Sequence, residues 1–233
     1  MVNYTDAFEK PFTDIKNLLI GTLLSIIPII SWFAIGFQMK CSGVGKSKYS
    51  KRMPKWKNFG DLFVKGFFNF AITFIYLMPA AIVLMIGAGT GVFKIFTAIP
   101  WLELSQTESN DAVRALMHIT IQDLIPILAI AAPFFIIAGI LALISVYILP
   151  IAVLSYLEKE NLSDAFNLKV FKKSFTGDYF IAWLLMNLLA FALIKILGII
   201  PLLGIPAAIF ITGVISFSVF GQIYQAKRIR NRN

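Results

Sequence analysis

Few side chains in this sequence are suited to catalysis or to metal binding. The 233 residues include one histidine and one cysteine. If a helix begins near Asn110, Asp111 and His118 share one face of it, where they could bind a metal ion or exchange protons. A solvated stripe on an amphipathic helix explains the same spacing, and we favour it. We therefore expect no catalytic residue, no metal site and no cofactor, in a protein that is not an enzyme.

A short motif resembles the end of a phosphate-binding loop. It consists of Ser42-Gly43-Val44-Gly45-Lys46-Ser47. A phosphate-binding loop needs a further glycine five residues before Gly45, where this chain has Lys40, and it needs a preceding strand. Because an apolar span is predicted there instead, we interpret the motif as part of a flexible cationic loop.

The segment from Lys40 to Lys57 is strongly basic, with seven basic residues and no acidic one, and the whole chain has a formal net charge of +9. In a soluble protein this charge would suggest nucleic acid. In a membrane protein, basic loops set the orientation and attract anionic headgroups, so we expect lipid rather than nucleic acid as the partner. The residues expected at the headgroups are Lys46, Lys48, Lys51, Arg52, Lys55 and Lys57.

The composition predicts a membrane protein. Hydrophobic residues make up 58% of the chain, and the mean hydropathy is +0.81. A soluble domain of this size could not bury so much apolar surface, so most of the chain should face lipid or other spans. We predict an all-α, polytopic integral membrane helix bundle in the cell membrane, with about five spans and with interfacial amphipathic helices.

Four apolar regions account for the five spans. They cover residues 18–39, 62–93, 124–154 and 179–225, and a turn near Pro201 divides the last region into a two-span hairpin. In the first region Pro28 leaves two interpretations, a single kinked span or a re-entrant hairpin of two half-length helices. We favour the single span, because irregular backbone at membrane depth must be buried by protein. The hairpin would place the N-terminus on the cytoplasmic side.

The polar segments predict an orientation. An interfacial helix is expected over residues 1–17, and a basic loop with an aromatic helix is expected over 40–61. The aromatic helix is indicated by Trp56, Phe59, Leu62 and Phe63, which recur at helical spacing as the chain enters the next span. By the positive-inside rule, the basic loop, residues 155–178 and the basic tail 226–233 are cytoplasmic, and residues 97–123 form an outer loop. With a single first span, the N-terminus lies outside.

One pattern in this region carries a resemblance to a family. It consists of Pro54-x-Trp56-x-Asn58-Phe59-Gly60-x-Leu62-Phe63-x-x-Gly66. The pattern resembles a domain-of-unknown-function family of archaeal multi-span membrane proteins, over most of the chain. Family members often carry acids around the tryptophan, whereas this chain has Lys55 and Lys57, so a ligand shared at this segment is in doubt. The resemblance implies a membrane fold and no known activity.

Two sets of residues are predicted to pack helices together. Small residues recur in the last span at four-residue spacing, as Gly204, Ala208, Thr212 and Ser216. Small side chains let helix backbones approach closely in lipid, so this ridge should pack against the preceding span, with a homodimer contact as the alternative. Asn69 and Asn187 lie at equal predicted depth and could hydrogen-bond to each other, unless each bonds to its own helix.

Two classes of function remain. One is a structural, interaction or lipid-associating membrane protein. Its partner would be a second copy of the chain, in a homo-oligomer, or an unidentified membrane protein. The other is a transporter or channel subunit for a small neutral solute, which would need a water-filled cavity lined by Asn69, Thr73 and Asn187. We favour the first class, because the lysines of the predicted spans lie near span ends, where a lysine can extend to the interface.

Overall fold

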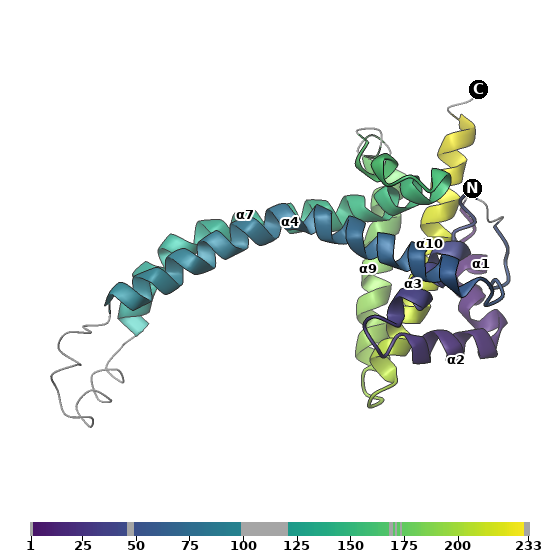
Figure 1. The fold of residues 1–233 in the computed structure, drawn as a ribbon, viewed down its shortest axis with the longest axis horizontal. Coiled ribbons are helices and arrows are strands. Elements are labelled where there is room, and N and C mark those ends of the chain that lie inside the picture. Colours follow the sequence, from purple (N-terminus) through teal and green to yellow (C-terminus); the bar gives the residue numbers. More distant parts are fainter. Residues whose placement is uncertain are drawn as a thin grey trace. The chain divides into compact units, whose positions relative to one another are not determined.

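Helices form most of the described chain. The computed structural model in Figure 1 describes residues 2–45, 49–98, 121–167, 170, 172 and 174–230, and none of these residues forms a strand. The chain divides into two compact units. Unit 1 comprises residues 1–74 and 147–233, and unit 2 comprises residues 75–146.

Within the described residues, four helices are long and apolar enough to cross a bilayer. They are α4 (Phe59–Ala98), α7 (Ile121–Lys159), α9 (Gly177–Leu197) and α10 (Gly204–Arg230). A span needs about 20 apolar residues, since each residue advances a helix by about 1.5 Å. All four meet that length, which confirms the predicted all-α, multi-pass membrane fold. Residues 198–203 join α9 and α10 at the predicted turn.

The first apolar region is not one span, so the prediction of a single kinked helix over residues 18–39 is wrong. It forms α2 (Ile15–Leu24, 10 residues) and α3 (Ser31–Cys41, 11 residues), with a turn over residues 25–30. Pro28 lies in this turn, because proline lacks the N–H that a continuous helix requires. The Ser25 hydroxyl also donates to the Gly21 carbonyl at 2.7 Å, which ties down the end of α2.

The predicted N-terminal helix over residues 1–17 is divided into short elements. These are α1 (Tyr4–Glu9) and the 3-10 helix η1 (Lys10–Thr13), followed by the first turn of α2. The division follows from the caps. The Asn3 side chain accepts a hydrogen bond from the backbone of Asp6, and the Asp14 side chain accepts one from the backbone of Asn17.

Trp56 is not part of a helix, contrary to the prediction of an aromatic helix that includes it. Helix α4 begins at Phe59, immediately after Asn58, which has a φ of 56°. Asparagine tolerates this left-handed conformation better than most residues, and it ends any helical continuation toward Trp56. A further 3-10 helix, η2 (Leu162–Phe166), follows α7.

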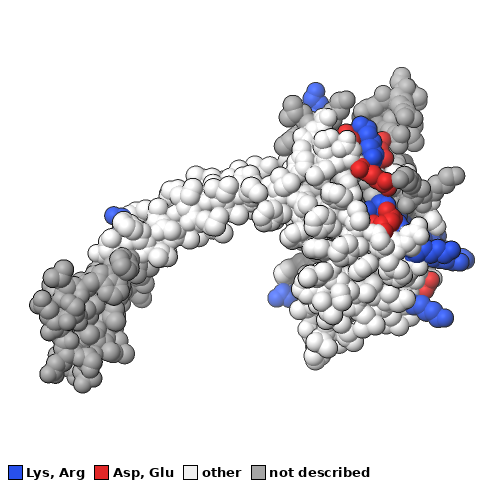
Figure 2. Space-filling view, viewed as in Figure 1, with Lys and Arg blue, Asp and Glu red and all other residues white. Residues whose placement is uncertain are grey.

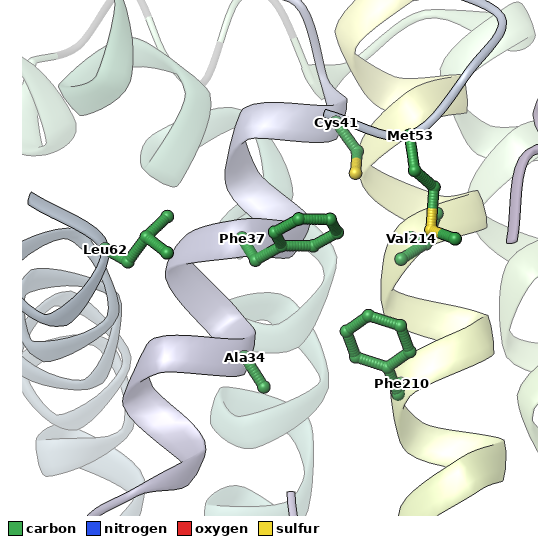
Figure 3. Packing of buried hydrophobic residues seen from close by; sticks show 7 residues of the cluster. All are labelled: Ala34, Phe37, Cys41, Met53, Leu62, Phe210 and Val214. Carbon is green, nitrogen blue, oxygen red and sulfur yellow. The ribbon is translucent and has the colours of Figure 1, made fainter. Parts of the chain in front are cut away.

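The core of unit 1 lies around α3, between the start of α4 and α10 (Figure 3). Phe37 is fully buried, and its ring stacks on the Trp56 ring with centroids 4.0 Å apart. Phe210 of α10 lies on the same aromatic group, 6.0 Å from Phe37. The remaining buried members of this cluster are Ala34, Cys41, Met53, Leu62 and Val214.

Single glycines allow α3 to approach both of its neighbours closely. A Cβ added at Gly36 would overlap the carbonyl of Leu62 in α4, and one added at Gly66 would overlap the carbonyl of Trp32 in α3. On the side of α10, Gly213 lies against the Gln38 side chain and Gly221 against the Ser42 carbonyl. Small residues therefore bring these backbones together, as expected for helices in lipid.

The predicted ridge of α10 lies partly against α9. A Cβ on Gly204 would overlap the carbonyl of Leu197 at the end of α9, and Ala208 is fully buried. Thr212 and Ser216 are half-buried. The closest approach of α10 to α3 uses a different face of the helix, at Gly213 and Gly221.

The hydrogen bond of the Asn187 amide differs from the predicted one, which would join it to Asn69. Asn187 is exposed, and its amide donates to the Trp183 carbonyl at 2.8 Å, one turn earlier in α9. The Thr73 hydroxyl likewise donates to the backbone carbonyl of Asn69 at 2.8 Å. In both cases a polar side chain in an apolar helix bonds to its own backbone. For Asn187 this was the alternative considered.

Unit 2 consists of a pair of packed helical segments, residues 75–98 of α4 and 121–146 of α7. The Ser145 hydroxyl donates to the Tyr76 carbonyl at 2.7 Å. Gly87 lies against the Phe134 side chain, where a Cβ would overlap it. Many of its large apolar side chains are exposed, as expected of surface that faces lipid.

Candidate membrane-surface site

A buried lysine joins the N-terminal segment to the end of α3. Lys10 is only 1% exposed, and its Nζ donates to the Cys41 carbonyl at 2.7 Å. The same ammonium group lies 4.4 Å from the centre of the Tyr49 ring, whose electron-rich face attracts a cation. Lys10 therefore contacts residues on both sides of positions 46–48 of the basic loop.

Further hydrogen bonds attach the loop to the N-terminal segment. The Met53 backbone donates to the Thr13 hydroxyl at 3.2 Å, and the Asn17 amide donates to the Pro54 carbonyl at 3.0 Å. Met53 itself is buried in the core cluster. The part of the loop around residues 49–54 is therefore packed onto η1 and the first turn of α2.

The same end of unit 1 also holds the last turns of α7 and α10. The Asn3 backbone donates to the Gln222 side chain at 2.7 Å. The Gln225 amide donates to the Gly43 carbonyl, and the Tyr224 hydroxyl donates to Glu158 at the end of α7. We call this region, which includes Asn3, Lys10, Gly43, Tyr49, Glu158 and Gln222, the polar end of unit 1.

The basic residues of the loop differ in whether an acid neutralises them. Lys51 lies 3.0 Å from Asp6 and 2.9 Å from Glu9, and the hydrogen bonds that its ammonium group donates to Glu9 and Asp6 raise its pKa. In contrast, Arg52, Lys55 and Lys57 are exposed, and their side chains form no ion pair within the described residues. These three therefore present uncompensated positive charge.

A second charged group joins α3, α4 and the end of α7. Asp61 binds both Lys40, at 2.9 Å, and Lys65, and Lys65 also lies 3.4 Å from Glu160. The Lys65 side chain is only 9% exposed and lies close to both of these carboxylates. Asp61 and Lys65 are four residues apart on a helix, a spacing that could have revealed this pair from sequence.

The charges of unit 1 are unevenly distributed. Figure 2 shows most of its visible charged side chains along one side, with a broad uncharged surface elsewhere. This distribution is what a membrane protein requires, since charged groups must reach water or headgroups and apolar groups must meet lipid. The polar end of unit 1 is therefore the candidate surface for contact with headgroups.

Several predicted residues lie outside the described part of the chain. These are Lys46, Lys48, Asp111 and His118, together with the outer loop beyond residue 98.

Cys41 is buried, and its burial raises the pKa of the thiol to about 12. A buried thiol of this kind is unreactive. The described residues contain no group of three or more His, Cys, Asp or Glu side chains that could hold a metal ion.

Sequence reasoning missed Lys10, although this residue has a testable effect on stability. Its burial lowers its pKa below the ordinary 10.5, because the charged form loses hydration. Between these two pKa values the unfolded chain binds more protons than the folded chain, so the free energy of unfolding rises with pH. We expect Lys10→Met to remove a rise of at most about 1.4 kcal/mol per pH unit.

The measurement is detergent-mediated unfolding at a series of pH values below 10.5, compared between the wild type and the variant. Lys16→Met, at an exposed lysine of α2, is the matched control and should keep the rise. If wild type and Lys10→Met show the same dependence on pH, Lys10 does not carry this effect.

Comparison with known proteins gives a family. The family described as "Protein of unknown function (DUF4013)" matches residues 19–203 of this chain. The match begins within α2 and ends in the turn before α10, so it covers most of both units. No curated protein and no solved structure matches the chain. Because the matched residues make up well over half of its length, the chain belongs to the DUF4013 family.

Proposed function

We propose that this protein is a non-catalytic protein of the cell membrane that associates with anionic lipid headgroups at the polar end of unit 1. The observation that carries the proposal is the difference among the loop cations. Lys40 and Lys51 have carboxylate partners, whereas the exposed Arg52, Lys55 and Lys57 have none within the described residues. Cations left without an acid can attract phosphate groups at a membrane surface.

The packing of the loop supports the same proposal. Lys55 and Lys57 flank Trp56, which stacks on Phe37 in the core. Binding a headgroup therefore costs little further ordering of the backbone that carries these lysines. The cytoplasmic orientation of this surface, and the absence of a nucleic acid partner, belong to the proposal. The transporter alternative receives less support, because Thr73 and Asn187 bond to their own helices.

The test compares two double variants that remove the same charge. Lys55→Gln/Lys57→Gln removes two of the unpaired cations. Lys94→Gln/Lys195→Gln removes two exposed cations near the C-terminal ends of α4 and α9. Each basic residue near a membrane surface contributes up to about 1 kcal/mol, so the first variant should lose up to about thirtyfold in relative affinity for anionic lipid.

The full-length protein would be reconstituted in phosphatidylcholine vesicles. The immobilised fraction of spin-labelled phosphatidylglycerol, measured against spin-labelled phosphatidylcholine, gives the relative affinity. We expect the control variant to keep the preference of the wild type for phosphatidylglycerol. An equal loss in both variants, or no loss in the first, would mean that the loop lysines serve only to orient the protein.

A further inference from the structure

The segment from α2 to α3, which we call the N-terminal hairpin (residues 15–41), begins and ends at the same place. At its start, the Asn17 amide bonds to the Pro54 carbonyl at 3.0 Å. At its end, the Cys41 carbonyl accepts the hydrogen bond from Lys10 at 2.7 Å. Figure 1 shows α2 running crosswise below α1, and α3 running back from its far end. Both ends therefore belong to the polar end of unit 1.

The arms of the hairpin are too short to cross a bilayer. Helix α2 has 10 residues and α3 has 11. At about 1.5 Å per residue each arm is about 15 Å long, roughly half of the hydrocarbon thickness of about 30 Å. A hairpin that starts at the membrane surface can thus reach no deeper than about the middle of the bilayer.

The outward surface of the hairpin is apolar. Exposed side chains at four-residue spacing follow α2 into the turn, namely Ile15, Leu19, Leu23 and Ile27, which are 58%, 55%, 57% and 51% exposed. Ile29 in the turn is 63% exposed. No charged residue lies between Asn17 and Met39. The opposite arm is covered by protein, since Ala34 and Phe37 of α3 are buried.

Part of the backbone of the turn is hydrogen-bonded from within, which lowers the cost of placing it in hydrocarbon. The Ser31 backbone donates to the Ile27 carbonyl at 2.7 Å, and the Phe33 backbone donates to the Ile30 carbonyl at 3.0 Å. At the other side of the turn, the Ser25 backbone donates to the Gly21 carbonyl at 3.1 Å. These bonds reduce the number of unpaired polar groups that the turn brings into lipid.

We propose that the N-terminal hairpin is re-entrant: it enters the bilayer from the side of the basic loop, contacts the acyl chains of that leaflet with the outward face of α2, and returns to the same side. The N-terminus and the basic loop then share one side of the membrane, and α4, α7, α9 and α10 are the full spans. The hairpin adds protein volume to one leaflet only. This topology holds whether or not the loop prefers anionic headgroups.

The experiment uses single cysteines in the full-length protein. Thr5→Cys and Arg52→Cys report the two segments expected on one side, Leu202→Cys reports the turn between α9 and α10, and Ile27→Cys reports the tip. Cys41 is buried and can stay, and each variant is repeated with Cys41→Ala so that its reactivity is controlled. An impermeant maleimide is added to sealed, oriented vesicles, and a nitroxide at each position is tested against oxygen and a water-soluble nickel complex.

We expect maleimide to label Thr5→Cys and Arg52→Cys from the same side and Leu202→Cys from the other side. The nitroxide at Ile27→Cys should be accessible to oxygen and shielded from nickel. Labelling of Thr5→Cys and Arg52→Cys from opposite sides would overturn the proposal in favour of a single span. Access of the nickel complex to the tip would place the hairpin on the membrane surface. Spin–spin broadening at Ile27→Cys that disappears on dilution with unlabelled protein would show that a second copy of the protein covers the tip. Either result would overturn the proposal.

Discussion

Replacing Phe37 with alanine is expected to lower the free energy of unfolding by about 3–5 kcal/mol, the usual cost of truncating a buried phenylalanine. Phe37 has no exposed surface, and its ring joins three parts of unit 1. It belongs to α3, stacks on Trp56 of the loop and lies 6.0 Å from Phe210 of α10. Its removal leaves a cavity that these elements cannot close without moving apart.

The measurement is unfolding in mixed micelles with increasing SDS, followed by tryptophan fluorescence, because Trp56 stacks directly on the changed side chain. Phe12→Ala is the matched control. It makes the same chemical change at a side chain that is 56% exposed, and it should alter stability by no more than about 0.5 kcal/mol. Equal losses in the two variants would show that Phe37 is not a central contact.

The long spans could be predicted from sequence because length and composition alone determine them. Apolar regions of more than 20 residues formed α4, α7, α9 and α10, and the proline and glycine residues near Pro201 located the turn between the last two. None of these conclusions needs a contact between distant residues.

The first apolar region could not be decided in this way. Pro28 is compatible with a kinked helix and with a turn between two helices. The decision comes from distant contacts, in which Lys10 binds the Cys41 carbonyl and Asn17 binds the Pro54 carbonyl. These contacts bring both ends of the region together, and no periodicity within residues 18–39 encodes them.

A repeating pattern led to one packing prediction, of which the structure shows the contact with α9 at Gly204, whereas isolated glycines led to no prediction. The four-residue repeat that includes Ala208 pointed to one face of α10. The glycines at which α3 meets α4 belong to no such repeat, because a crossing of two helices needs only one small residue at the point of contact. At Gly36 and Gly66 that residue lies opposite a carbonyl of the other helix.

Gly66→Ala is expected to destabilise the protein by roughly 3 kcal/mol, the upper part of the usual range for overpacking. The added Cβ would overlap the backbone carbonyl of Trp32 in α3. Backbone within a helix cannot move aside as a flexible side chain can, so α3 and α4 must separate. Their separation would also disturb the contact of Trp32 with Phe63 and Phe67 of α4, whose ring centres each lie 5.3 Å away.

Gly60→Ala makes the same change six residues earlier in the same helix, where no atom lies within 4 Å of the added Cβ. Alanine favours a helix over glycine by up to about 1 kcal/mol, so this control should match the wild type or exceed it slightly. SDS-mediated unfolding of the two variants side by side measures the difference. Because helix propensity favours alanine at both positions, any loss confined to Gly66→Ala reports the contact between α3 and α4. If Gly66→Ala were as stable as Gly60→Ala, the two helices would not be in close contact at this crossing.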